Sequence, residues 1–151
     1  MIHGVEVKEL MSIPDERGRL MEVMRCDEKF FNKFGQVYIT TAYPGVVKGW
    51  HYHKQQEDNM TVIKGMMKIV LYDGRKNSPT FGQVNEFFLG VHSPYLVKIP
   101  ALVLHGFKCI SEEESIVINV TSEPYNRKSP DEFRVHPHKN QIPYDWNRKD
   151  G

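Results

Sequence analysis

Three histidines carry the chemistry that the sequence suggests most directly. His51 and His53 stand two positions apart within residues 45–65, so on a strand both imidazoles project from the same face. Glu57 follows shortly after this pair, and His105 comes from a separate stretch of the chain. Imidazoles grouped with a carboxylate can bind a transition metal, or they can move protons near neutral pH. Both kinds of site remain open on these residues alone.

The spacing of these residues resembles the metal-binding pattern of the cupins, a superfamily of small β-barrel proteins. Gly45 precedes the His-x-His pair at the required distance, and Pro100 stands five positions before the third histidine. The resemblance implies a cupin fold, with four candidate metal ligands: His51, His53, Glu57 and His105. Three features depart from the pattern: seven rather than six residues between Glu57 and Gly65, leucine at position 102, and cysteine at position 109.

Strands are the elements that would hold these histidines. Apolar and polar residues alternate over residues 60–72, with Met67 and Ile69 on one face and Lys64 and Lys68 on the other, as a half-buried strand requires. Shorter strands are expected at four further places: residues 37–41, 84–88, 95–99 and 115–120. Gly- and Pro-containing turns separate them, which predicts an all-β sandwich or double-sheet barrel. The cupin resemblance implies the second form, a jelly-roll barrel. We also expect a helical turn over residues 27–33 and a wrapping tail from residue 123.

The composition indicates one ordinary domain, covering residues 1–151. Hydrophobic residues make up 40% of the chain and charged residues 26%, and the formal net charge is +1, which argues against nucleic acid as a partner. No apolar stretch approaches the roughly 20 residues that a membrane span needs, and nothing at the N-terminus is typical of a signal peptide. A cytoplasmic protein with free thiols at Cys26 and Cys109 is therefore expected.

Five motifs, in order along the chain, resemble those of the dTDP-4-dehydrorhamnose 3,5-epimerase family. They are DERGRLMEV at residues 15–23, GVVKGWHYH at 45–53, LYDGRKNSPTFG at 71–82, IPALVLHGF at 99–107 and WNRKDG at 146–151. The resemblance covers nearly the whole length. It implies a cofactor-free enzyme that inverts carbon next to the ketone of a nucleotide-linked 4-keto-6-deoxysugar.

The same resemblance implies roles for individual residues. His51 takes the place of the base that removes the proton next to the ketone, and Asp150 takes the place of its carboxylate partner. His105 takes a position near the sugar ring or its developing enolate, where a hydrogen-bond donor stabilises negative charge. Further residues take positions implied to bind the substrate: Arg17 and Lys48 at the diphosphate, Glu22 near the nucleotide base, and His53 and Asn59 near the central motif.

Two family positions carry different residues in this chain. The segment that should hold a lysine for the enolate reads Glu57, Asp58, Asn59. The position of the tyrosine acid counts to Ile118, and the adjacent Asn119 is expected to face away. Epimerisation at a single carbon, or isomerisation of the keto sugar, is therefore favoured over inversion at two carbons.

Two alternatives to this enzyme remain. One is a metal-dependent cupin enzyme that uses the four candidate ligands. The other is a cupin that binds a sugar nucleotide without catalysis. The family resemblance also implies a homodimer in which an N-terminal strand passes between subunits.

Overall fold

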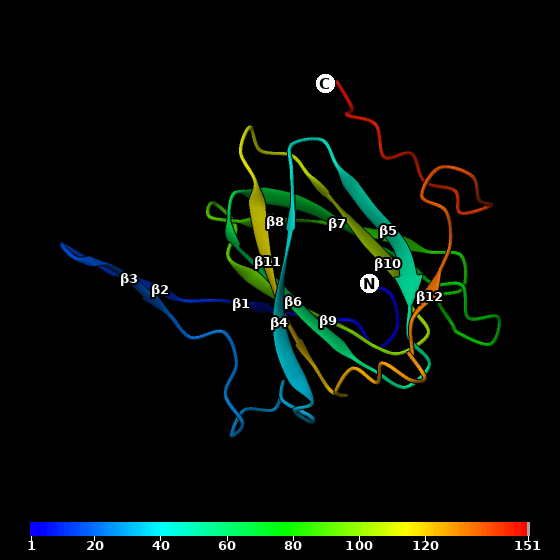
Figure 1. Cartoon of the computed structure of the whole chain (residues 1–151), viewed down its shortest axis with the longest axis horizontal. Helices are drawn as coiled ribbons and strands as arrows, with labels where there is room; N and C mark the ends of the chain where they lie inside the picture. Colours follow the sequence, from blue (N-terminus) through cyan, green and yellow to red (C-terminus); the bar gives the residue numbers. More distant parts are fainter. Residues whose placement is uncertain (151) are drawn as a thin grey trace.

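The computed structural model describes residues 1–150, so Gly151, the last residue of the C-terminal motif, lies outside the described residues. Two five-stranded antiparallel sheets face each other (Figure 1). The first contains, in spatial order, β1 (Glu6–Glu9), β9 (Tyr95–Ile99), β6 (Asp58–Lys64), β11 (Ser115–Thr121) and β4 (Gln36–Ala42). The second contains β12 (Phe133–Arg134), β5 (Val47–Tyr52), β10 (Leu104–Cys109), β7 (Met66–Tyr72) and β8 (Val84–Gly90). A separate hairpin of β2 (Ser12–Asp15) and β3 (Gly18–Met21) projects from the body.

The core lies between the two sheets, where alternate residues of each strand point inward. Met67, Ile69 and Leu71 of β7 are fully buried there, as the period-two pattern predicts. Residues from the first sheet, among them Met60 and Val97, complete the same apolar cluster. The fold is thus the all-β cupin jelly roll that the sequence predicts.

Two local predictions are wrong. Residues 60–72 form two strands, β6 and β7, because the chain reverses at Gly65, whose φ of 69° is a conformation that L side chains rarely adopt. A Cβ at this glycine would also lie 2.2 Å from Oγ of Ser115. Residues 27–33 form turns rather than a helical turn, since so short a run does not offset the cost of helix nucleation. Within residues 1–150, no helix is long and apolar enough to cross a membrane.

The C-terminal tail covers the outer face of the second sheet. Trp146 and Tyr144 pack against Trp50 of β5, with ring centroids 4.9 Å and 5.8 Å from that of Trp50. The ammonium of Lys68 lies over the ring of Tyr144 at 5.3 Å from its centroid, so this outward lysine is nearly buried. Earlier in the tail, β12 pairs with β5 and places Arg134 opposite His51. The tail therefore both seals one face and extends the sheet beside the histidines.

Candidate active site

Two neighbouring strands place His51 opposite His105. β5 and β10 are antiparallel, and in their register these two residues are direct partners. Partners in such a pair project to the same side of the sheet, and the two imidazole centroids are 4.0 Å apart. His53 follows directly after β5, with its centroid 5.6 Å from that of His51 and 5.7 Å from that of His105. The structure therefore brings the three predicted histidines together.

The carboxylate among these rings belongs to Asp58, the first residue of β6. Its Oδ2 lies 3.2 Å from Nε2 of His53 and 3.0 Å from Nε2 of His105. The residue is 1% exposed. One ligand atom from each of four side chains lies within 4.8 Å of the others, and these side chains are His51, His53, Asp58 and His105. We call this set the histidine cluster.

The structure corrects the choice of Glu57 as the acidic member. Its carboxylate accepts a hydrogen bond from Asn32 at 2.7 Å, away from the imidazoles. Adjacent residues of an extended chain point to opposite sides, so only one of Glu57 and Asp58 can face the barrel interior. The sequence holds a signal for the correct residue: six residues separate Asp58 from Gly65, as the cupin pattern requires.

Burial and mutual contact set the charges of the histidine cluster. Burial raises the pKa of Asp58, but its ion pairs with His105 and His53 outweigh burial and hold that pKa well below its usual value. Burial lowers the pKa of His53, but Asp58 and the carbonyl of Asp131 raise it above its usual value. Burial, followed by repulsion from His105, lowers the pKa of His51 well below its usual value. Asp58 is therefore an anion, and His51 is a neutral imidazole at pH 7.

Backbone carbonyls orient two of the rings. Nδ1 of His105 lies 3.0 Å from the carbonyl oxygen of Val103, and Nδ1 of His53 contacts that of Asp131. A carbonyl oxygen only accepts hydrogen bonds, so each Nδ1 carries a proton and each Nε2 turns toward Asp58. Both Nε2 atoms and Oδ2 of Asp58 are buried and lack a partner with hydrogen-bond geometry. Such a group of atoms can share protons or surround a cation.

A pocket of about 1190 Å³ opens beside the histidine cluster. His51 and His53 lie on one wall, which β5 supplies together with Lys48. Alternate residues of β4 form a second wall: Gln36, Tyr38 and Thr40. The irregular part of the tail, from Glu123 to Pro137, forms the third. In Figure 1, β4 and β5 diverge from the loop that joins them, which leaves this side of the barrel open.

A buried asparagine links two of these walls. Asn119 of β11 is fully buried, and its Nδ2 donates to Oδ1 of Asp58 and to the hydroxyl of Tyr38, both at 2.8 Å. The expectation that Asn119 faces away is therefore wrong. The side chains of Val117 and Asn119 point from β11 into the barrel, whereas that of Ile118 lies on the other side of the sheet. Sequence reasoning missed both Tyr38 and Asp58 as functional candidates.

Among the other predicted residues, Lys48 lines the pocket, where its Nζ donates to the hydroxyl of Thr40 at 3.2 Å. Asn59 is buried behind the pocket, and its Nδ2 donates to the carbonyl of Val120 at 2.9 Å. His105 is likewise buried and lies beneath the wall rather than on it. These positions make Lys48 a candidate for direct contact, and Asn59 and His105 candidates for support.

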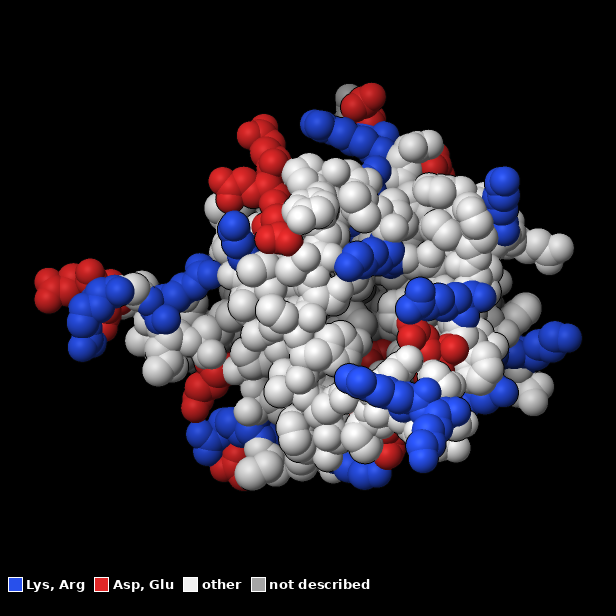
Figure 2. All heavy atoms as spheres, in the orientation of Figure 1, with Lys and Arg blue, Asp and Glu red and all other residues white. Residues whose placement is uncertain are grey.

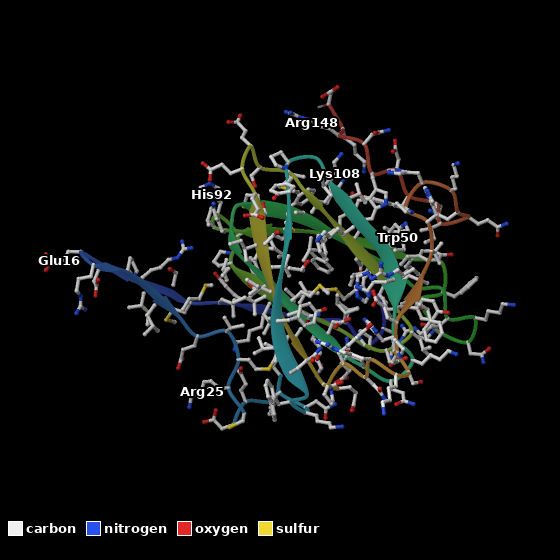
Figure 3. The ribbon with its side chains drawn as sticks, in the orientation of Figure 1. Glu16, Arg25, Trp50, His92, Lys108 and Arg148 are labelled. Atoms are coloured by element: carbon white, nitrogen blue, oxygen red, sulfur yellow. The ribbon has the colours of Figure 1, made fainter. Side chains whose placement is uncertain are left out.

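Arg17 and Glu22 lie outside the pocket of their own chain. Arg17 is at the turn of the β2–β3 hairpin, where it pairs with Asp15, and Glu22 follows β3 and pairs with Arg25. In Figure 3 the label of Glu16 marks the far end of this hairpin, well away from Trp50 of β5.

Asp150 is exposed, and none of the ion pairs or hydrogen bonds of residues 1–150 joins it to His51. Its neighbour Lys149 lies 3.7 Å from Glu86 of β8. β10 and β7 separate β8 from β5 in the sheet. The expected pair of Asp150 with His51 is thus not formed within the chain, because the tail runs outward across the sheet. The carboxylate beside the imidazoles is that of Asp58.

Comparison with known proteins gives consistent matches. The sequence model of the family described as dTDP-4-dehydrorhamnose 3,5-epimerase matches residues 1–151. The spore coat polysaccharide biosynthesis protein SpsL of Bacillus subtilis (strain 168) is 39% identical over 147 residues, with 97% of each chain covered. The probable low-salt glycan biosynthesis epimerase Agl13 of Haloferax volcanii is 40% identical over 148 residues, covering 97% of this chain and 95% of that protein.

The solved structure of a dTDP sugar isomerase from Desulfovibrio desulfuricans G20 superimposes with a TM-score of 0.92 at 31% identity. The superposition covers 99% of this chain and 94% of that one. The sequence match and the structural superposition both extend over almost the whole chain. The chain therefore belongs to the dTDP-4-dehydrorhamnose 3,5-epimerase family.

Proposed function

We propose that this protein epimerises a nucleotide-linked 4-keto-6-deoxyhexose, with His51 as the base that removes the proton next to the ketone. The observation that carries the proposal is the position of His51, whose side chain lies on the pocket wall and is grouped with the buried carboxylate of Asp58. A base with a free lone pair at neutral pH is what deprotonation of such a carbon requires.

Asp58 supports the proton transfer through its charge. When His51 takes a proton it becomes a cation, and the nearby anion of Asp58 favours that form. His105 holds Asp58 from below, so we assign it a supporting role rather than contact with the sugar. A positioned general base typically contributes about 10²–10⁴ in rate.

The pocket suits the size and charge of a nucleotide sugar. Its volume of about 1190 Å³ is somewhat larger than that of most small-molecule sites, which are roughly 300–1000 Å³, so it has room for a nucleotide joined to a sugar. Lys48, Lys54 and Arg134 line it and provide positive charge for a diphosphate. Figure 2 shows lysine and arginine side chains gathered over the face that carries β5 and β12. The family description supports a dTDP-linked substrate.

We further propose that the working unit is a homodimer. Arg17 and Glu22 take family positions at the nucleotide, but they lie on or beside a projecting hairpin outside their own pocket. The hairpin exposes Ile13 and Leu20, which are 55% and 59% accessible. Docking it on a second copy buries this apolar surface and carries Arg17 to another subunit. Sedimentation equilibrium of the wild-type protein tests the dimer.

Deuterium exchange tests the base assignment. The protein is incubated in D₂O with dTDP-linked 4-keto-6-deoxyglucose, and NMR follows deuterium at the carbons beside the ketone. We expect exchange in the wild-type protein and in a His92→Ala control, whose side chain is exposed on a turn. In His51→Ala, exchange should fall by about 10²-fold or more. Exchange that survives in His51→Ala would exclude His51 as the base.

A metal-dependent reaction in the same pocket is a second candidate, favoured by one observation. Nε2 of His53, Nε2 of His105 and Oδ2 of Asp58 converge without hydrogen-bond partners, and carbonyls fix both rings through Nδ1. This donor set fits zinc or iron, and ligating histidines commonly show the same carbonyl contact. A bound ion would polarise the substrate ketone.

Metal analysis separates the two candidates. One equivalent of a transition metal in purified protein, lost in Asp58→Asn, favours the metal-dependent reaction. Full epimerase activity after dialysis against a chelator, in protein shown to contain no metal, excludes it.

A further inference from the structure

Inversion at a carbon needs two groups, because the proton leaves from one face of the sugar and a proton returns to the other. His51 supplies the first group on the β5 wall of the pocket. The second must face it from another wall and must hold a transferable proton at neutral pH. β4 belongs to the opposite sheet, and its residues line the same pocket.

Tyr38 is the residue of the β4 wall that meets this requirement. The inward positions of this strand are Gln36, Tyr38 and Thr40, and of these only the phenol is an effective acid. The Thr40 hydroxyl already accepts a hydrogen bond from Lys48 at 3.2 Å. Tyr38 is 36% exposed and lines the pocket, so its side chain borders the space that a substrate would fill.

The hydrogen bond of Tyr38 leaves its own proton free. Nδ2 of Asn119 donates to the phenol oxygen at 2.8 Å, and its other hydrogen goes to Oδ1 of Asp58 at 2.8 Å. The oxygen of Tyr38 is thus an acceptor in this contact, and its O–H remains available to a substrate. Asn119 is fully buried and cannot turn away, so it fixes the position of the hydroxyl.

We propose that Tyr38 is the general acid that delivers a proton to the face of the sugar opposite His51. This inference rests on the proposed epimerase function. His51 takes the proton from the carbon, and the electron pair moves to the ketone oxygen to give an enolate. The enolate carbon then takes the phenolic proton of Tyr38 as the ketone re-forms. Solvent returns a proton to the phenolate and removes one from the imidazolium.

The protonation state of Tyr38 agrees with this role. Burial, aided by the negative charge of Asp58, raises the pKa of Tyr38 to about 12, so the phenol keeps its proton at pH 7. Tyr43 provides a comparison outside the pocket. It is a second phenol, but it lies in the loop between β4 and β5 and is 70% exposed, and its side chain makes none of the hydrogen bonds found among residues 1–150.

The test compares Tyr38→Phe with Tyr43→Phe and wild-type protein in D₂O. Two quantities are followed on the same substrate: deuterium entry at the carbon beside the ketone, and formation of the inverted product. In Tyr38→Phe we expect deuterium entry within about tenfold of wild type, while inversion falls by about 10²–10³-fold. His51 can return deuterium to the face from which it took the proton, so exchange occurs without inversion. Tyr43→Phe should keep both rates.

Three outcomes overturn the inference. Inversion at the wild-type rate in Tyr38→Phe excludes Tyr38 as the acid, even though the proposed function survives. Equal loss of exchange and inversion, in a variant whose melting temperature and dTDP affinity match wild type, shows that Tyr38 serves the first proton transfer instead. Absence of exchange and inversion in the wild-type protein defeats the proposed function itself, and the inference with it.

Discussion

Two buried aspartates of this protein, Asp58 and Asp73, are ionised for different reasons. Asp73 begins the turn-forming segment after β7, and all its side-chain partners come from the next seven residues. Arg75 Nε lies 2.8 Å from Oδ1, and the hydroxyls of Ser78 and Thr80 each donate to Oδ2 at 2.6 Å. This carboxylate is fully satisfied by its own loop.

Asp58 takes its partners from several elements. Gln56 and Asn119 donate to Oδ1, both at 2.8 Å, whereas Oδ2 faces two imidazoles without hydrogen-bond geometry. Imidazoles change charge near neutral pH, but a guanidinium and hydroxyls do not. Both carboxylates are buried and have a lowered pKa, so these two properties do not distinguish a functional carboxylate from a structural one. Only the neighbours of Asp58 are able to move protons.

The largest effect should come from Asp58→Asn. The variant keeps the shape of the side chain, and its amide can donate to the Nε2 atoms of His53 and His105, so the fold should persist. Without the anion, the imidazolium of His51 loses its stabilisation, and kcat/KM should fall by about 10²–10³-fold. Steady-state kinetics measure this, with circular dichroism as the control for folding. Unchanged kcat/KM would show that Asp58 is structural, like Asp73.

Asp73→Asn should lower stability instead of activity. The change leaves the guanidinium of Arg75 without its charge partner and weakens the network around Oδ2. We expect a loss of about 2–4 kcal/mol in the free energy of unfolding, measured by urea denaturation. The kcat/KM of the folded variant should match wild type within about twofold. A larger loss of activity would erase the distinction between the two carboxylates.

Acid should remove the contribution of Asp73. Burial raises its pKa, but Arg75, Ser78 and Thr80 outweigh burial and lower it below the usual value. A lowered pKa in the folded state stabilises the protein above the unfolded-state pKa of about 3.9. The stability difference between wild type and Asp73→Asn should be constant from pH 8 to about pH 5 and shrink below it. Denaturation at several pH values checks this, and a constant difference down to pH 2 would contradict it.

The smallest effect should come from Thr80→Val, which removes one of several donors to Asp73. The expected loss is about 1 kcal/mol in the free energy of unfolding, with no change in kcat/KM. Additional loss of activity would show that the turn influences the pocket. Thermal melts and kinetics on the same preparation give both values.

Much of the fold could be predicted because alternation along strands depends on local sequence. The predicted strand over residues 95–99 matches β9, and those over 37–41, 84–88 and 115–120 lie within the observed strands. The break at Gly65 was missed because residues on both sides share the same alternation, and only the positive φ reveals the reversal.

The site was harder to predict than the fold. The three histidines could be predicted to lie together because only two features are needed: the short His-x-His spacing and the pairing of one further strand. Asp58 and Tyr38 were missed because their roles depend on which face of β6 and β4 turns inward, and that is decided by packing across both sheets. The expected pair of Asp150 with His51 does not form for a related reason. The path of an irregular tail is set by side-chain contacts, and no alternation of apolar and polar residues predicts it.

The pocket has two walls of regular strand and one of irregular chain. The segment from Glu123 to Pro137 lies against the strand walls. It is anchored to them at Asp131, whose carboxylate accepts hydrogen bonds from the backbone N–H groups of residues 54–56, and at Val135, which pairs with Trp50. Substitutions in an irregular segment, away from such anchoring residues, cost a scaffold little stability. Changes elsewhere in this segment can therefore alter the shape of the pocket, while the histidine cluster held by the strands stays in place.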